Sequence, residues 1–183
     1  SGTWPGGAVM GAIASPCSPE RLFVPERGNE RAYRDALGSF TTGITVVTAM
    51  TDQGPIGMTV NSFTSVSLEP PLVLWSPAKS SSKHGSFQQA VHFAIHVLGA
   101  EQDHLCQAFS RGGAGFAGLP WTTSEEGVPT LCETLARFEC RRSATHDAGD
   151  HSLILGRVLR VALRDGEPLC YSRGMLGRFA GRN

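Results

Sequence analysis

The two lysines of the chain enclose three consecutive serines, and this stretch is the part of the sequence best suited to binding an anion. Its order is Lys79, Ser80, Ser81, Ser82, Lys83. Serine hydroxyls, exposed backbone N–H groups and two ammonium ions together favour a ligand such as a phosphate. A solvated polar loop is the alternative, because most serine-rich loops hold no ligand.

A second polar stretch, Thr59–Ser65, precedes this loop. Apolar side chains alternate with small hydroxyl residues through residues 62–68, which is the pattern of a β-strand. A strand built only for packing would contain more valine and isoleucine. We therefore expect one edge or face of this strand to present a row of hydroxyls and backbone amides.

Among the six histidines, His151 is the best candidate for contact with a ligand. It follows a turn that ends at Asp150 and enters an apolar strand, so that it stands at the mouth of the strand. A histidine that only hydrogen-bonds Asp150 is an equally good interpretation. His92 and His96 would lie on one face of a strand, about 13 Å apart, which is too far to share a metal ion.

Other kinds of catalytic site find no support. The five cysteines contain no C-x-x-C pair, which argues against a zinc site and a disulfide framework and for a reducing compartment, the cytoplasm. No Ser-His-Asp arrangement, carboxylate pair or P-loop can be assigned. Polar residues placed for binding, without a strong acid–base set, are typical of a protein whose cofactor does the chemistry.

Short strands must position these residues. The pattern predicts strands over residues 44–49, 56–60, 72–75, 93–98, 136–141, 153–161 and 169–171. Turns are expected at 52–55 and 147–150, a hairpin at Asp165-Gly166, and short helices near 29–37, 82–90 and 100–110. No β–helix–β alternation is sustained. We therefore expect a mainly β fold with peripheral helices, closed into an antiparallel barrel.

The composition fits one folded domain, with 183 residues and 40% hydrophobic content. Residues 1–20 are rich in Gly, Ala, Pro and Ser, and we expect an extended N-terminal arm there, followed by the domain over residues 21–183. The formal net charge of +0 offers no basic field for nucleic acid. No apolar run approaches the ~20 residues that a membrane span needs.

Five blocks of the sequence, in order, resemble the short-chain flavin reductases, the reductase components of two-component flavin-dependent monooxygenases. The blocks are Tyr33–Thr48, Gly57–Leu74, Phe93–Leu98, Gly149–Gly156 and Tyr171–Gly174, within a match over Tyr33–Phe179. One block could arise by chance, whereas five in the family's order are a specific signal.

The resemblance implies a flavin-binding split β-barrel, usually a homodimer. Such a protein reduces FMN or FAD with NADH or NADPH and supplies the reduced flavin to a partner monooxygenase. The choice of flavin and of nicotinamide nucleotide stays open from the sequence, as does whether flavin is a tight cofactor or a passing substrate. Two other functions also stay open: a flavin-binding carrier or sensor without turnover, and a related split-barrel reductase acting on a corrin or a pyridoxine phosphate.

The resemblance also implies roles for individual residues. The flavin ring and ribityl chain would be lined by Thr59, Val60, Asn61 and Ser62, with Ser65 nearby, and the phosphate would be taken by Ser80, Ser81, Ser82 and Lys83. His151 would be the catalytic residue, positioning the nicotinamide without acting as a proton donor, and Arg173 and Gly174 would border the same pocket.

Three positions depart from the family's pattern. His96 stands where asparagine is common, which implies a changed hydrogen bond or a changed response to pH. Lys83 replaces a frequent threonine, which implies stronger phosphate binding. Leu176 replaces an aromatic residue, so stacking on the nicotinamide or adenine from this position is not expected.

Overall fold

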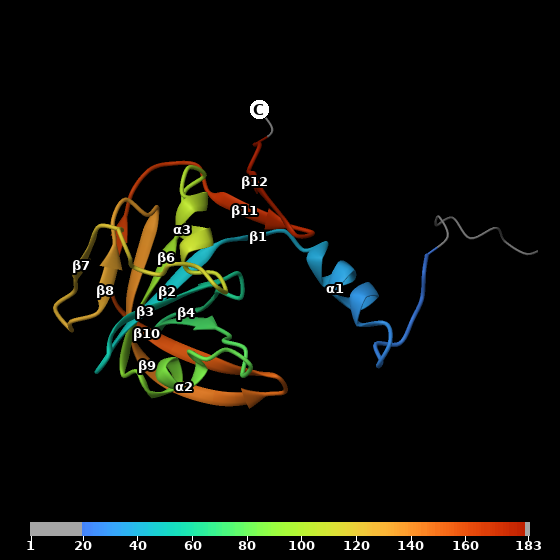
Figure 1. The fold of residues 1–183 in the computed structure, drawn as a ribbon, viewed down its shortest axis with the longest axis horizontal. Coiled ribbons are helices and arrows are strands. Elements are labelled where there is room, and N and C mark those ends of the chain that lie inside the picture. The colour runs from blue at the N-terminus through green and yellow to red at the C-terminus, as the bar shows by residue number, and fades with distance from the viewer. Residues whose placement is uncertain (1–19, 182–183) are drawn as a thin grey trace, which may run out of the picture.

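A computed structural model describes residues 20–181 of the chain. Its helices are α1 (Glu30–Gly38), α2 (His84–Gln89) and α3 (Asp103–Ala108). Its strands are β1 (Thr42–Gly43), β2 (Thr45–Thr51), β3 (Gly54–Val60), β4 (Thr64–Leu68), β5 (Pro71–Trp75), β6 (His92–Val97), β7 (Trp121–Thr123), β8 (Pro129–Leu131), β9 (Ala136–Ala148), β10 (His151–Leu163), β11 (Leu169–Ser172) and β12 (Met175–Arg178), as Figure 1 shows. The predicted mainly β fold with peripheral helices is confirmed. Within the described residues, no helix is long and apolar enough to cross a membrane.

Seven strands form the main sheet, in the order β3-β2-β6-β9-β10-β5-β4. All neighbours are antiparallel, and β2–β3, β4–β5 and β9–β10 are hairpins of consecutive strands. Their turns form where proline or glycine interrupts the strand pattern, at Pro70 between β4 and β5 and at Gly149 between β9 and β10. Gly149 has a φ of 68°, a conformation that glycine adopts without strain. The order leaves β3 and β4 as the two edges, joined through residues 61–63.

One apolar core gathers side chains from across this sheet. Its buried members are Val47, Ala49, Val73, Trp75, Phe87, Phe93, Ile95, Cys140 and Ile154. Met58 of the edge strand β3 and Phe63, next to the edge strand β4, pack against the same cluster. Because residues from both ends of the strand order reach one core, the sheet curls around it.

A second buried cluster lies under α3. It consists of Ile44, Val46, Leu98, Leu105, Cys106, Phe109, Leu131 and Leu169. The members come from β2, α3, β8, β11 and residues that flank β2, β6 and α3, so this core attaches the smaller sheets, β7–β8 and β1–β11–β12, to the main one. The predicted helix near residues 100–110 is confirmed as α3, and Leu105, Cys106 and Phe109 are buried on one side and at the end of this helix.

His96 fixes the β7–β8 hairpin to the main sheet from inside the protein. The side chain is 0% exposed. Its Nδ1–H donates to Val46 O at 3.0 Å, and its Nε2 accepts from the backbone N–H of Leu131 at 3.1 Å. Burial lowers the pKa of His96 to about 4, since the charged imidazolium would lose its hydration, and the nearby Arg137 charge adds to the effect. This residue therefore acts in the core as a neutral imidazole.

Helix α1 lies apart from the sheets (Figure 1). None of its residues is buried, and Tyr33 and Leu37 are 45% and 57% exposed. The predicted helix is confirmed, although the Asn29 side chain caps no helix N–H: its Oδ1 accepts from Glu26 N and its Nδ2 donates to Val24 O. The apolar side of α1 is therefore not covered by the described part of this chain.

The C-terminal region differs from the sequence prediction. Asp165-Gly166 does not form a hairpin, because β11 pairs with β1 and β12 and not with β10. Ala100 N donates to Glu167 O at 2.8 Å, and this contact leads the chain away from the main sheet. The expected tail beyond β11 folds back as β12. Three other short strands, β1, β7 and β8, were also missing from the prediction.

Candidate functional site

The serine loop, residues 79–83, lies against the turn between β9 and β10. Lys79 N donates to Asp150 O at 2.9 Å, and Ala78 forms an isolated bridge with His151. Ser152 N in turn donates to Pro77 O at 3.1 Å. These backbone bonds bring the three serines next to His151, which lies about 70 residues later in the sequence.

Both lysines of the loop use their ammonium groups within the protein. Lys79 Nζ donates to the Asp147 carboxylate and, at 2.6 Å, to Gly149 O, so it braces the β9–β10 turn. Lys83 Nζ donates to Gly57 O on β3 at 2.7 Å. Burial lowers the pKa of Lys83. The two charges that the sequence offers for a phosphate thus hold the surrounding strands, and phosphate binding by Lys83 stays a prediction.

The connection between the edge strands is tied to the start of the serine loop. Ser62 Oγ accepts from Ser76 N at 2.9 Å and donates to Ser76 O at 3.2 Å. Val60 O accepts from the hydroxyl of Thr45 at 2.9 Å. Ser62 therefore joins the predicted ring-binding stretch to the end of β5, a few residues before the serines. Within the described residues, Asn61 makes no side-chain hydrogen bond, and its side chain is exposed.

Thr59 uses its polar groups within the protein, and its predicted place beside the flavin stays a prediction. Its Oγ1 donates to Cys106 O at 2.7 Å, and its N–H donates to Phe109 O at 3.0 Å. Both acceptors belong to α3 and the residue that ends it. Thr59 thus anchors the end of α3 to β3, and its hydroxyl is already satisfied by the protein.

A cavity of ≈ 440 Å³ opens beside this connection. It is lined by Phe40, Thr41, Thr42, Gly43, Asn61, Ser62, Phe63 and Thr64. The hydroxyl Oγ1 of Thr42 is buried and has no hydrogen-bond partner among the described residues. An unsatisfied buried hydroxyl in the wall of a cavity fits a ligand that brings its own donor or acceptor.

His151 is held by its neighbour. Its Nδ1 lies 2.7 Å from Asp150 Oδ1, and its side chain is 43% exposed. The hydrogen bond from His151 is the main reason that the pKa of Asp150 lies below its ordinary value. With Nδ1–H donated to the carboxylate, Nε2 of a neutral ring is left as an acceptor. The hydrogen bond between His151 and Asp150, one of the two interpretations of the sequence, is therefore present, and it orients the imidazole ring.

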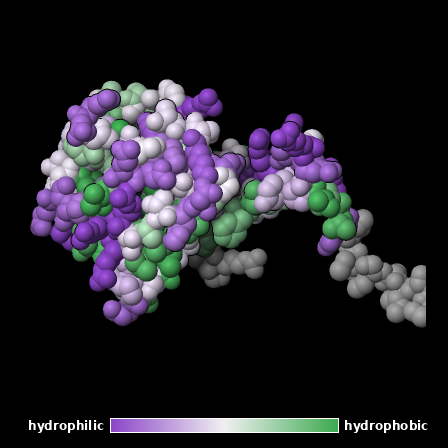
Figure 2. All heavy atoms as spheres, turned by 90° about the horizontal axis from the view of Figure 1, so that it is seen from below, coloured by the Kyte–Doolittle hydropathy of each residue, from purple (hydrophilic) through white to green (hydrophobic). Residues whose placement is uncertain are grey.

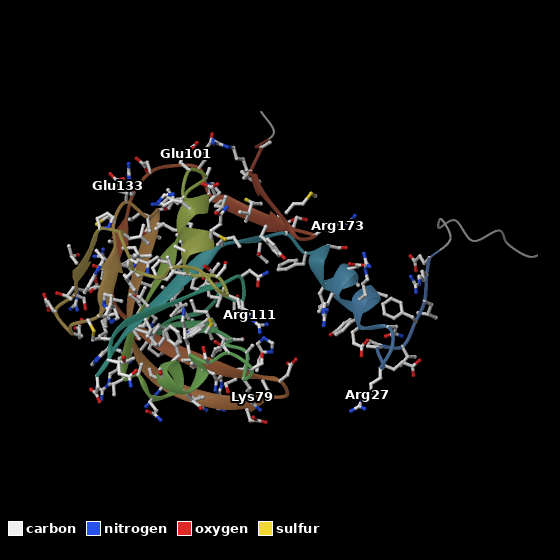
Figure 3. All side chains as sticks on the ribbon, viewed as in Figure 1. Arg27, Lys79, Glu101, Arg111, Glu133 and Arg173 are labelled. Carbon is white, nitrogen blue, oxygen red and sulfur yellow. The ribbon has the colours of Figure 1, made fainter. Side chains whose placement is uncertain are left out.

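Arg173 and Gly174 form the tight turn between β11 and β12, with φ of 50° and 82°. Arg173 N donates to Gly38 O at 3.0 Å, and Arg173 Nη2 donates to Ser39 Oγ at 3.3 Å. In Figure 3, Arg173 lies by the end of α1, away from Lys79. No described contact connects this turn with His151. Leu176, the other departure in the tail, is 40% exposed on β12.

The structure adds residues that sequence reasoning did not assign to the site. Thr42 lines the cavity, and it stands in the first of the five matched blocks, where the run of hydroxyls at 39–42 was a usable signal. Ser152 is buried, and its Oγ lies 2.9 Å from Nε2 of His84, which joins β10 to α2. Arg111 follows α3 and its side chain is exposed. Nothing in the local pattern singled out Ser152 or Arg111.

Known proteins are similar to this chain over most of its length. A family model described as a flavin reductase like domain matches residues 37–180. SmoA of Agrobacterium fabrum, an FMN reductase (NADH), is 63% identical over 172 residues, which cover 94% of this chain and 98% of that protein. HsaB of Rhodococcus jostii, the reductase subunit of a flavin-dependent monooxygenase, is 40% identical over 146 residues, 79% of this chain and 75% of that protein.

Solved structures agree with these relatives. The NADH:FAD oxidoreductase SgcE6 of Streptomyces globisporus superimposes with a TM-score of 0.82 at 34% identity, covering 91% of this chain and 96% of that one. The flavin reductase PheA2 gives a TM-score of 0.78 at 31% identity, covering 83% of this chain and 99% of that one.

Proposed function

The chain belongs to the flavin reductase-like family, and we propose that it reduces FMN with NADH and supplies the reduced flavin to a separate monooxygenase. The observation that carries this proposal is the 63% identity to an FMN reductase (NADH) over 98% of that protein's length. Relatives that are reductase components of flavin-dependent monooxygenases support the delivery of reduced flavin to a partner.

The site residues fit a flavin. The cavity beside residues 61–64 has the size of a small-molecule site, and its unsatisfied Thr42 hydroxyl needs a polar partner. We assign the ring and ribityl chain to Thr59, Val60, Asn61, Ser62 and Ser65, and the phosphate to Ser80, Ser81, Ser82 and Lys83, as the family resemblance implies. Thr59 and Val60 would contribute through their backbone and their shape, since the Thr59 hydroxyl is bonded to Cys106 O.

His151 would position the nicotinamide. Bound flavin supplies the ring nitrogen N5, which accepts the hydride carried by the nicotinamide. Because Asp150 holds Nδ1–H of His151, Nε2 can accept a hydrogen bond from the carboxamide NH₂. Such a bond would fix the rotation of the nicotinamide and bring its reactive carbon into line, which is an effect of orientation and not of proton transfer.

We also propose that two copies of the chain form a homodimer and that the curled sheet is a split barrel. Tyr33, Leu37 and Phe40, at or next to α1, are exposed to 45%, 57% and 78%. Figure 2 shows green, apolar side chains along one side of the projecting segment and purple, polar ones along the other. A second copy would cover this surface and the border of the pocket at Arg173 and Gly174. Sedimentation of the purified protein tests the dimer directly.

We propose the cytoplasm as the compartment. Cys106, Cys132, Cys140 and Cys170 are free thiols, as a reducing environment requires.

The test of the proposed reaction is the oxidation of NADH by the purified protein, followed by NADH absorbance with FMN, with FAD and with no flavin added. We expect a rate that rises with flavin and saturates, and a higher kcat/KM for FMN than for FAD. NADPH in place of NADH is the matched control and should be the poorer reductant. Absence of flavin-dependent oxidation with either nucleotide would refute the proposal.

A further inference from the structure

The proposed site needs a positive charge for phosphate that the lysines do not provide freely. FMN and NADH both carry phosphate groups, and a phosphate binds best to charged donors. Lys79 Nζ is bonded to Asp147 and to Gly149 O, and Lys83 Nζ is bonded to Gly57 O. A guanidinium near β3, where Lys83 Nζ reaches Gly57 O, would meet the need better.

Arg111 lies close to β3 because this strand holds the end of α3. Thr59 donates twice, from Oγ1 to Cys106 O at 2.7 Å and from N–H to Phe109 O at 3.0 Å. Arg111 follows Phe109 by two residues, so its Cα lies within about 8 Å of the bonded Phe109 backbone. The side chain of Arg111 adds several ångströms of reach, which is enough to span the next residues of the β3–β4 connection.

The loop that carries Arg111 is held in one shape by its own contacts. Gly113 N donates to Ser110 O at 3.0 Å, and Gly115 N donates to Ala108 O at 2.8 Å. A Cβ on Gly113 would stand 2.3 Å from Ala108 O, so only glycine fits there. The ring of Phe116 packs edge-on to the buried Phe109 with centroids 4.8 Å apart. Because the backbone of this loop is fixed, only the side chain of Arg111 has to be ordered when a ligand binds.

Arg111 itself is exposed and makes no ion pair or side-chain hydrogen bond within residues 20–181. Figure 3 shows it on the same side of the molecule as Lys79 and Arg173, between the two. Arg178, by contrast, is bonded to Glu101 and Glu167, and Arg160 to three glutamates. Arg111 therefore keeps all five guanidinium donors available to a ligand.

We propose that the guanidinium of Arg111 binds a phosphate group of a bound substrate. This inference rests on the proposed function and names a residue of the same site. The phosphate comes from FMN or from the pyrophosphate of NADH, and the two sources share the same recognition chemistry. Thr59 acts as the positioning residue that brings α3 and Arg111 to the β3 edge.

The experiment compares Arg111→Gln and Arg111→Lys with the parent, using FMN, riboflavin and NADH as the varied substrates. Riboflavin has the same ring as FMN and no phosphate, so it isolates the phosphate contact. We expect Arg111→Gln to raise the KM for FMN about tenfold or more, with riboflavin unchanged and with partial recovery in Arg111→Lys. If NADH is the source, its KM rises with either flavin. Arg164→Gln, near Glu133 and far from the site, is the matched control for loss of one arginine.

Equal rises for FMN and riboflavin with no rise for NADH would overturn the inference, because the contact would then not involve phosphate. Unchanged KM values for FMN and NADH would overturn it as well. If the parent protein fails to oxidise NADH at all, the proposed function fails, and the inference is then judged on direct binding of FMN and riboflavin measured by flavin fluorescence. Weaker FMN binding in Arg111→Gln, with riboflavin unaffected, would still support it.

Discussion

Replacement of His96 should remove a large part of the protein's sensitivity to acid. The imidazole joins three strands: Nδ1–H donates to Val46 O on β2, and Nε2 accepts from Leu131 N on β8. A second proton would have to occupy Nε2, where the Leu131 N–H already points. Protonation would therefore break this bond and bury an uncompensated charge.

The magnitude follows from the pKa of His96, which burial lowers from 6.5 to about 4. Because the unfolded chain binds the proton more tightly, the stability from this group is complete above the unfolded pKa and decreases as the pH falls toward 4. The full loss is about 3.4 kcal/mol, since each pKa unit corresponds to about 1.36 kcal/mol. At about pH 5.5 the loss is roughly 1.4 kcal/mol, and at about pH 4.5 roughly 2.5 kcal/mol.

The assay is urea unfolding of the parent, His96→Asn and His96→Gln across this range of pH at one protein concentration, which keeps any contribution from association constant. Asparagine retains a donor near Nδ1, and glutamine retains an acceptor near Nε2. Each variant loses one of the two bonds and some packing, so each should be less stable at neutral pH by about 1–3 kcal/mol. The difference in the free energy of unfolding between the parent and each variant should then decrease steadily as the pH falls.

All other titrating groups are common to the three proteins, so only His96 can change the difference in their free energy of unfolding with pH. A difference that stays constant from neutral pH to about pH 4.5 would therefore refute this reasoning. A difference that narrows already above about pH 7 would refute it too, because an unfolded histidine with an ordinary pKa near 6.5 is hardly protonated there and could not cause the change. Spectra of the folded variants at neutral pH separate a loss of stability from a failure to fold.

Three further changes test other parts of the structure. Ser62→Ala removes both bonds to Ser76 and should raise the KM for FMN several-fold while lowering the free energy of unfolding by about 1–2 kcal/mol; flavin kinetics and urea unfolding check this. His151→Ala should lower kcat/KM for NADH about tenfold and leave FMN binding unchanged, as nucleotide titrations and flavin fluorescence would show; equal loss of both would contradict the assigned role. Glu139→Gln should cost about 2 kcal/mol of stability with normal KM values, because the buried carboxylate accepts a 2.8 Å bond from Arg160; unfolding in urea measures it.

The local parts of the fold could be predicted from the sequence. The β2–β3 and β9–β10 hairpins follow from alternation and from the turns expected at residues 52–55 and 147–150, since neighbouring strands with short connections pair with each other. The Asp165-Gly166 signal failed, since β11 pairs with β1 and not with β10. Gly166 has a φ of 155°, a conformation that other residues rarely adopt, so the glycine serves an irregular connection and not a hairpin turn.

The residue types of the site could be predicted, but their hydrogen-bond partners could not. The sequence predicts Lys79 and Lys83 as phosphate ligands because both are charged and flank three serines. Their acceptors, Gly149 O in the β9–β10 turn and Gly57 O on β3, come near only after the chain has folded. The same holds for Thr59, whose hydroxyl is bonded to Cys106 O. A polar side chain next to a site has two possible partners, the protein and the ligand, and only the structure decides between them.

This division of hydrogen bonds bears on how long a flavin stays. The hydroxyls of Thr59 and Ser62 are hydrogen-bonded to backbone oxygens of the protein, whereas Asn61, Ser80 and Ser82 make no side-chain hydrogen bond within the described residues. The bonded residues make the cradle rigid, which lowers the entropy lost when a flavin binds. In the proposed flavin site, direct side-chain hydrogen bonds to a flavin would come from these unbonded side chains and would be few. A rigid site with few direct bonds favours fast exchange over tight retention, and a protein that must hand reduced flavin to a separate oxygenase needs that balance. Direct measurement of the FMN dissociation rate, before and after reduction, would decide whether flavin is a substrate here or a resident cofactor.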